Sequence, residues 1–274
     1  MKPNPYQFWY KLNYNERRAY QNMLFPDGLR VSLKNKKSRT ALLLSGQLRN
    51  CRKSYPLIKK NLIDVYDADV FLSTWSDSHK IERSVLAGGS SSDDSTIDEL
   101  IQMYKPITIE VDKYEDDLVS RFEKMFEPYK DNAPYETKPL AVFMMWYKTW
   151  KVNELRNRYQ EANGFKYDVI IKSRFDLDCD SEIQIIEPRP NEIYIPNGWD
   201  WNGGVNDLFA LGNNEVMNYY CNMFNNLLPM IRDGHLFHPE YLMKIFLDMS
   251  GFKINRPIMD LSLRDIKVYS KEAN

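Results

Sequence analysis

The sequence lacks an excess of charge of either sign, and it has few cysteines. Its 37 lysines and arginines are balanced by 38 aspartates and glutamates, which leaves a formal net charge of -1. This balance excludes the global attraction by which strongly basic chains bind nucleic acid or anionic membranes. The three cysteines, Cys51, Cys179 and Cys221, form no CxxC pair and no disulfide-framework spacing, so we expect reduced thiols.

Long apolar runs are also missing. No window approaches 18 apolar residues, and the first twenty residues contain neither a continuous apolar core nor a small-residue cleavage site. We therefore expect no transmembrane segment and a cytoplasmic location. Aromatic residues, in contrast, make up 14% of the chain, which favours either packing or a site that stacks sugars or bases on flat rings.

The length and composition predict a globular protein with a sizeable core. The chain has 274 residues, of which 43% are hydrophobic. Residues 1–38, with an aromatic-rich helical pattern, the turn "FPDG" and the basic run "KNKKSR", predict an N-terminal helical appendage. Residues 39–274 are predicted to form a single domain.

The first half of that domain predicts alternating strands and helices. Short apolar runs predict strands at residues 41–44, 67–75, 106–114 and 167–175. Helical spacing predicts helices at residues 54–66 and 139–163, and a glycine- and serine-rich stretch predicts a loop at residues 76–95. This order is typical of a parallel sheet. The fold class that follows is α/β, with a mostly parallel central sheet flanked by helices and a mixed C-terminal extension.

The stretch "YDVIIKSRFDLDCD", residues 167–180, places charge at the end of a buried strand. Alternation along a strand puts Lys172, Arg174 and Asp176 on one face, where the two cations need either the acidic cluster or a bound anion. Asp176 and Asp178 provide oxygen ligands that suit Mg²⁺ or Mn²⁺ bound together with substrate phosphates. The alternative interpretation of these aspartates is a solvated turn.

Five short motifs in a fixed order resemble those of a known family. They are "SGQLRNC", "DVFLSTW", "YDVIIKSRFDLD", "NDLFALGN" and "HPEYLMKIF". Over roughly residues 39 to 260 the chain resembles GT-A-fold glycosyltransferases of bacterial capsule and lipopolysaccharide loci and of large DNA viruses. The resemblance implies a GT-A-like catalytic domain, in a bacterial or host cytoplasm, that moves a sugar from a nucleotide-sugar donor to a glycan acceptor with Mn²⁺ or Mg²⁺.

The resemblance also implies roles for particular donor-side residues. Asp176 and Asp178 match the D-x-D element that holds the cation against the donor diphosphate. The end of the first strand, where the family holds the nucleotide, is matched by Gly46, Gln47 and Arg49. Lys172 and Arg174 are the cations expected to stabilise charge on the departing diphosphate.

The acceptor side is implied by residues later in the chain. Asp207 matches the position of a general base, which indicates an inverting reaction, and its alternative role is a helix or strand cap. His238 is a candidate metal or phosphate contact, against an ordinary role at a helix start. Trp199 and Trp201 are candidates for an acceptor platform, against simple packing of the loop.

Two other classes of function remain open at this point. A metal-dependent phosphohydrolase or nuclease also uses aspartates after a strand, although "DLDCD" lacks the residues that usually follow a phosphohydrolase nucleophile. A non-enzymatic glycan-binding module would share the aromatic richness and would ignore both metal and nucleotide.

Overall fold

The computed structural model describes residues 38–76, 96–113, 116–134, 137–179, 187–257, 259 and 261–263. The predicted appendage and the predicted loop at residues 76–95 lie almost wholly outside these ranges.

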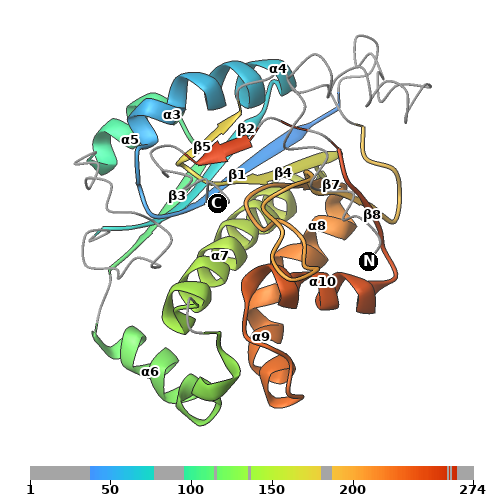
Figure 1. Ribbon diagram of the computed structural model, residues 1–274. Coiled ribbons are helices and arrows are strands. Elements are labelled where there is room, and N and C mark those ends of the chain that lie inside the picture. Colours follow the sequence, from blue (N-terminus) through green and yellow to red (C-terminus); the bar gives the residue numbers. More distant parts are fainter. Residues whose placement is uncertain are drawn as a thin grey trace, which may run out of the picture.

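A seven-stranded sheet forms the centre of the described residues, in the order β3-β2-β1-β4-β7-β6-β8 (Figure 1). Its strands are β1 (Thr40–Gly46), β2 (Asp69–Trp75), β3 (Thr108–Asp112), β4 (Val169–Ser173), β6 (Glu192–Tyr194), β7 (Ala210–Gly212) and β8 (Lys253–Asn255). The first four are parallel to one another, and β7 is antiparallel to both β4 and β6. The predicted fold class, a mostly parallel sheet with a mixed C-terminal extension, is confirmed.

A second, two-stranded antiparallel sheet pairs β5 (Leu177–Cys179) with β9 (Leu261–Leu263). The strand β5 carries Asp178, so the second aspartate of the D-x-D lies on an element of its own. Leu177 and Cys179 are buried in the same hydrophobic cluster as the inner residues of the nearby helices.

Helices cover both faces of the sheet, as Figure 1 shows. One face carries α3 (Cys51–Ile58), η2 (Lys59–Ile63), α4 (Asp64–Tyr66) and α5 (Ile97–Tyr104). The other carries α7 (Pro139–Asn163), α8 (Asn214–Cys221), α9 (Met223–Arg232) and α10 (Pro239–Ser250), with α6 (Asp116–Phe126) and η4 (Glu127–Asn132) beside α7. Alternate residues of β1 supply the two cores, since Ala41 and Leu43 belong to one cluster and Leu42 and Leu44 to the other.

The long helix α7 begins and ends as the sequence predicts. Pro139 occupies its first turn, where a missing backbone N–H costs nothing, and Gly164 follows its last residue with a φ of 67°. No helix among the described residues is both long enough and apolar enough to cross a membrane.

The order of connections creates a switch point between β1 and β4. The chain leaves β1 for β2 through α3 on one face of the sheet, and it reaches β4 from β3 through α7 on the other face. In open α/β sheets, ligands bind in the crevice outside the carboxyl ends of the strands at such a point. The segments that follow β1 and β4 are therefore where we expect a ligand to bind.

Candidate active site

The charged end of β4 lies at this crevice. All five residues of β4 are buried, and its apolar side chains alternate as predicted, because Ile170 joins the cluster under α7 while Val169 and Ile171 join the opposite one. The strand ends at Ser173, so Asp176 belongs to the turn after the strand and not to the strand face on which the sequence pattern placed it.

Arg174 and Asp176 form a two-pronged ion pair. The Arg174 Nε and one terminal nitrogen donate to the two carboxylate oxygens of Asp176, each at 2.8 Å. Asp176 is only 6% exposed, so the guanidinium supplies the compensation that a buried carboxylate requires. This pairing is the acidic compensation that the sequence pattern left open as one possibility for Arg174.

Lys172 is compensated differently. Its side chain is fully buried, its Nζ donates to the backbone carbonyl of Asp207, and it lies 5.7 Å from the centre of the Trp146 ring. Burial lowers the pKa of Lys172 to about 8, against the opposing effect of the Asp207 charge. Lys172 is therefore a buried cation whose position is fixed, two residues before Arg174 in the chain.

Asp207 lies in the loop before β7 and is 5% exposed. Burial, and then the charge of Glu240, raise the pKa of Asp207 to about 6, while Lys172 and Arg174 act in the opposite direction. Its alternative role as a cap is not observed, since β7 begins only at Ala210. Asp207 is thus a buried carboxylate with a raised pKa, influenced by the charges of Lys172, Arg174 and Glu240.

The start of α10 brings a histidine and a glutamate to the same place. His238 caps this helix through its backbone position, without a side-chain cap hydrogen bond. Its Nδ1 instead lies 2.7 Å from Oε2 of Glu240, and its ring stacks on Trp201 with the centroids 3.8 Å apart and the planes 15° apart. Glu240 was not among the predicted site residues.

The loop that carries the two tryptophans is held in an unusual backbone conformation. Positive φ angles occur at Gly198, Trp199, Asn202 and Gly203, of 96°, 58°, 45° and 78°. For a bulky residue such as tryptophan this conformation is strained, and strain of this kind persists only where surrounding contacts enforce it.

Hydrogen bonds to several elements hold the loop in this conformation. Asp200 accepts from the backbone of Asn206 at 2.8 Å and from Arg256 at 2.6 Å and 2.8 Å. The Trp199 Nε1 donates to the carbonyl of Leu261 on β9 at 3.2 Å, while the side chain stays 37% exposed. The loop therefore presents a partly exposed, fixed indole ring beside the small sheet that carries Asp178.

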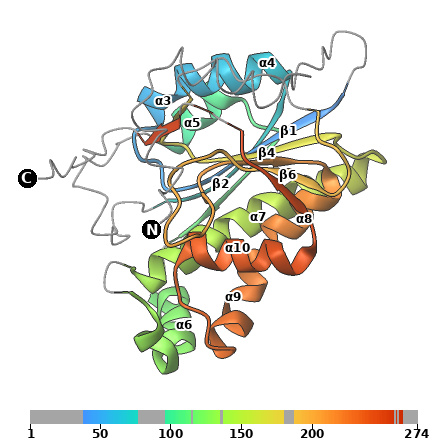
Figure 2. The ribbon, with the colours of Figure 1, turned by 45° about the vertical axis from the view of Figure 1, so that its right-hand side comes forward.

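The part of this loop that contains Gly204 packs against the start of α10; Figure 2 shows orange loop segments next to that helix. The backbone N–H of Val205 donates to the Glu240 carbonyl at 3.0 Å. A Cβ atom added at Gly204 would lie 2.4 Å from the backbone carbon of Glu240 and 2.5 Å from its oxygen. No side chain fits between the loop and the start of α10.

We expect Gly204→Ala to destabilise the fold by about 1–3 kcal/mol, the usual cost of overpacking, because the Cβ meets backbone atoms that cannot rotate away. Gly203→Ala is the matched control: a Cβ there has open space and meets only the cost of a positive φ, about 1 kcal/mol. Chemical denaturation measures both. Equal losses for the two variants would contradict the packing argument.

The predicted nucleotide residues follow β1 at the same edge. Gly46 ends β1 with a φ of 115°, and Arg49 Nε donates to Gln47 Oε1 at 2.5 Å. Because β1 and β4 are parallel, with Leu44 opposite Ser173, the segments after the two strands emerge on the same side of the sheet. The two predicted donor elements are therefore neighbours.

The carboxylates of the crevice can hold a metal ion only as a small ligand set. Among the described residues, no three histidine, cysteine, aspartate or glutamate side chains lie close enough to hold an ion, so Asp176, Asp178 and His238 do not assemble as one ligand set. Mg²⁺ and Mn²⁺ usually take only one or two carboxylates from a protein and share substrate phosphates. Asp176 and Asp178, 6% and 5% exposed, fit that smaller role.

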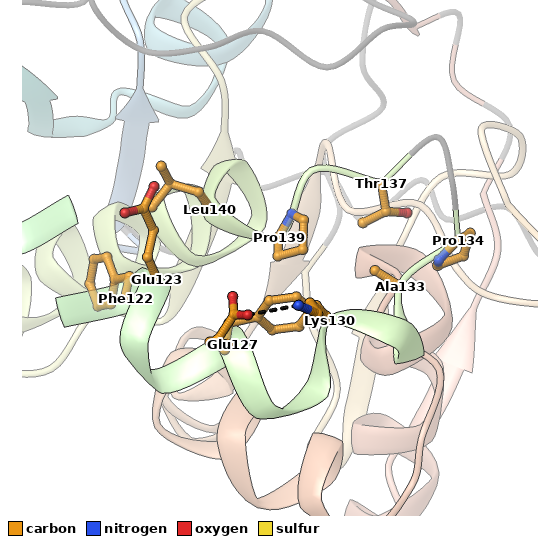
Figure 3. Close-up of a pocket in the computed structure, with 10 residues that line it drawn as sticks. Phe122, Glu123, Glu127, Lys130, Ala133, Pro134, Thr137, Pro139 and Leu140 are labelled. Atoms are coloured by element: carbon orange, nitrogen blue, oxygen red, sulfur yellow. Dashed lines mark hydrogen bonds and ion pairs between the residues drawn. The ribbon is translucent and has the colours of Figure 1, made fainter. Parts of the chain in front are cut away.

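A hollow of about 510 Å³ elsewhere in the structure lacks the groups for this chemistry. It lies among α6, η4 and the start of α7, where Figure 3 shows its lining side chains. Its charged residues include Glu127 and Lys130, which are paired at 2.8 Å, and none of the predicted site residues lines it. The candidate site is therefore the switch-point crevice and not this hollow.

Comparison with known proteins finds a distant structural likeness. No protein-family model matches it, and no curated protein matches it. Among solved structures, it is similar to the crystal structure of mouse xyloside xylosyltransferase 1 in its apo form, with 10% sequence identity, a TM-score of 0.39, and coverage of 80% of this chain and 84% of that one. A likeness this distant does not carry a function from one protein to the other.

Proposed function

We propose that the protein is a glycosyltransferase that moves a sugar from a nucleotide-sugar donor to a hydroxyl of a glycan acceptor. The observation that carries the proposal is the gathering of Lys172, Arg174, Asp176, Asp207 and Glu240 at the switch point of a mostly parallel sheet. The ordered motifs that resemble GT-A enzymes supply these residues and the segment after β1.

On the donor side, the chemistry requires charge stabilisation. Cleavage of a glycosyl–phosphate bond leaves a nucleoside diphosphate, on which negative charge develops. Arg174 has the planar fork that suits a phosphate, and Lys172 is a fixed cation behind it. A divalent ion held by Asp176 and Asp178 would supply further neutralisation of the diphosphate. Gly46, Gln47 and Arg49 are the proposed contacts to the nucleotide.

On the acceptor side, the reaction requires a base and a surface that orients the sugar. Asp207 is the proposed general base, since a carboxylate with a pKa near 6 is ionised at neutral pH yet basic enough to take a proton. Trp199 is the proposed stacking surface, because its ring is partly exposed and its position is fixed. An inverting outcome is proposed from Asp207 alone.

The alternatives have less support. A phosphohydrolase is less well supported because "DLDCD" lacks the residues that usually follow its aspartate nucleophile. A glycan-binding module needs aromatic surface but has no use for a buried lysine, arginine and two carboxylates, each of which is costly to bury.

A turnover screen tests the proposal. The purified protein is incubated with UDP-, GDP-, CMP- and dTDP-sugars, with and without Mn²⁺, and released nucleotide and glycosylated acceptor are measured. We expect one nucleotide class to be consumed with transfer to a glycan. Hydrolysis of DNA or of phosphomonoesters without sugar transfer would favour the nuclease or phosphohydrolase instead.

The proposed site predicts a bell-shaped pH profile. Asp207 must be ionised to act as a base, so kcat/KM falls as the pH drops through about 6, and Lys172 must be charged, so kcat/KM falls again as the pH rises through about 8. The charge of Glu240 raises the pKa of Asp207, so Glu240→Gln should move the acidic limb to lower pH. A profile that is flat from pH 5 to 9 would contradict both assignments.

A further inference from the structure

The small sheet of β5 and β9 has no further strand on either side among the described residues, so its outward-facing backbone groups need other partners. Two distant side chains provide them. Asn61 Nδ2 donates to the carbonyl of Cys179 on β5 at 2.5 Å. Trp199 Nε1 donates to the carbonyl of Leu261 on β9 at 3.2 Å. Because Cys179 and Leu261 lie opposite each other in the strand pairing, one cross-strand pair connects Asn61 to Trp199.

Asn61 occupies a position where the core would accept an apolar residue. It lies in the π-helical turn η2 and is only 2% exposed. Ile58, three residues earlier, and Leu62, the next residue, are fully buried in the cluster that also contains Cys179. An amide in such surroundings is costly unless it is hydrogen-bonded, and the bond to Cys179 compensates the burial of Nδ2.

The two-stranded sheet depends on anchors outside itself. Each of its strands has only three residues, and a pair this short is not stable alone. Leu177 and Cys179 anchor β5 in the core, whereas Leu261 on β9 is only partly buried. The Trp199 ring is 37% exposed, so packing holds it only in part. Its position therefore depends on the Leu261 carbonyl, and the position of Leu261 depends on β5.

We propose that Asn61 is a positioning residue: its buried amide fixes β5 and, through the pairing with β9, sets the place of the exposed Trp199 ring. The inference rests on the proposed glycosyl transfer only for what the ring binds, which is an acceptor sugar. The support of the ring itself involves no substrate. Asn61 then acts on the acceptor side of the reaction from within the helix layer, without touching the substrate.

The indole N–H signal of Trp199 tests this support without any substrate. The chain has six tryptophans, and the ¹H–¹⁵N signal of Trp199 is assigned by its loss in Trp199→Phe. Asn61→Leu keeps the size of the side chain and removes the donor. We expect it to shift this signal and to accelerate its exchange with solvent by about tenfold, as for the loss of one hydrogen bond. The signals of Trp75 and Trp146, buried in the opposite cluster, should not move.

Asn132→Leu is the matched control. Its Nδ2 also donates to the carbonyl of a distant element, at 3.4 Å, but the bond joins η4 to Ile231 of α9. It should leave the Trp199 signal unchanged. If Asn61→Leu does not fold, Asn61→Ala removes the same donor without adding apolar bulk and should shift the same signal. An unchanged Trp199 signal in a folded Asn61 variant, or an equal change in Asn132→Leu, would overturn the positioning role.

Acceptor kinetics separate this role from the proposed function. Asn61→Leu should raise the acceptor KM about two- to tenfold with little change in kcat, because aromatic stacking is of that size and acts in the ground and transition states alike. In a Trp199→Ala background, Asn61→Leu should add nothing further, and additive effects would overturn the inference. A shifted Trp199 signal in a protein that transfers no sugar would instead refute the proposed function and leave the support of Trp199 intact.

Discussion

Asp207→Asn is expected to reduce kcat by about 10²–10⁴-fold, the range that general acid–base catalysis usually contributes. The amide has nearly the same shape as the carboxylate, but it cannot take a proton from the acceptor hydroxyl. Donor affinity should change little, because Arg174 and Lys172 remain in place. Steady-state kinetics with saturating donor measure the loss, and calorimetry with the nucleoside diphosphate measures the donor affinity.

The control for this variant is Asp233→Asn, which makes the same chemical change at an exposed position after α9. It should retain full activity. A folded Asp207→Asn protein with wild-type kcat would remove Asp207 as the base. That result would also remove the support for an inverting reaction, which is proposed from Asp207 alone.

Arg174→Gln is expected to weaken both the fold and nucleotide binding. The change leaves the 6%-exposed Asp176 without its fork, and leaving a buried acceptor without its partner costs about 1–3 kcal/mol. It also removes the cation proposed to hold the diphosphate, so nucleotide affinity should fall by about ten- to a hundredfold, as expected for a lost charge-assisted hydrogen bond. The nucleotide affinity and stability of Arg174→Lys should lie between those of the wild type and Arg174→Gln, because lysine keeps the charge and loses the planar fork.

Arg52→Gln is the matched control for the stability effect. Arg52 also contacts a carboxylate, that of Glu99, at 2.5 Å, but both side chains are more than 40% exposed. Exposed pairs of this kind contribute about 0–1 kcal/mol. If the Arg174 variant were no less stable than the Arg52 variant and bound nucleotide normally, the ion pair would have neither of the roles assigned to it.

Much of the scaffold follows from local sequence patterns. The apolar run of β4 and its alternation are visible in the sequence because burial on both faces of a sheet selects apolar residues at successive positions. The ends of α7 are visible because Pro139 and Gly164 have strong local preferences. The capping-box pattern at Thr96 and Glu99, which begins α5, is also a local signal for a helix start.

The site is predicted less completely, because its contacts join distant segments. The sequence predicts site roles for separate residues, and the structure places their charges within reach of one another: Lys172, Arg174, Asp176, Asp207 and His238. Glu240 was missed because an acidic residue in the first turn of a helix is ordinary, and only the fold places it beside residues from β4 and the loop before β7.

Two further features of the site give no local signal at all. The positive φ of Trp199 is enforced by tertiary hydrogen bonds, and its residue type does not favour that conformation. The engagement of Asp176 by Arg174 depends on the turn after Ser173, whereas the alternation pattern assumed that the strand continued. In both cases the tertiary contacts override what the local residue pattern indicates.

Direct binding of a nucleotide sugar tests the central claim most simply. Thermal unfolding is followed with UDP-, GDP-, CMP- and dTDP-sugars, each with and without Mn²⁺, since a ligand that binds only the folded state raises Tm. We expect one nucleotide class to raise the Tm of the wild type. Arg174→Gln, compared with its own Tm without ligand, should show a much smaller rise. No shift with any nucleotide, or an undiminished shift in the Arg174 variant, would contradict a donor site at the carboxyl ends of β1 and β4.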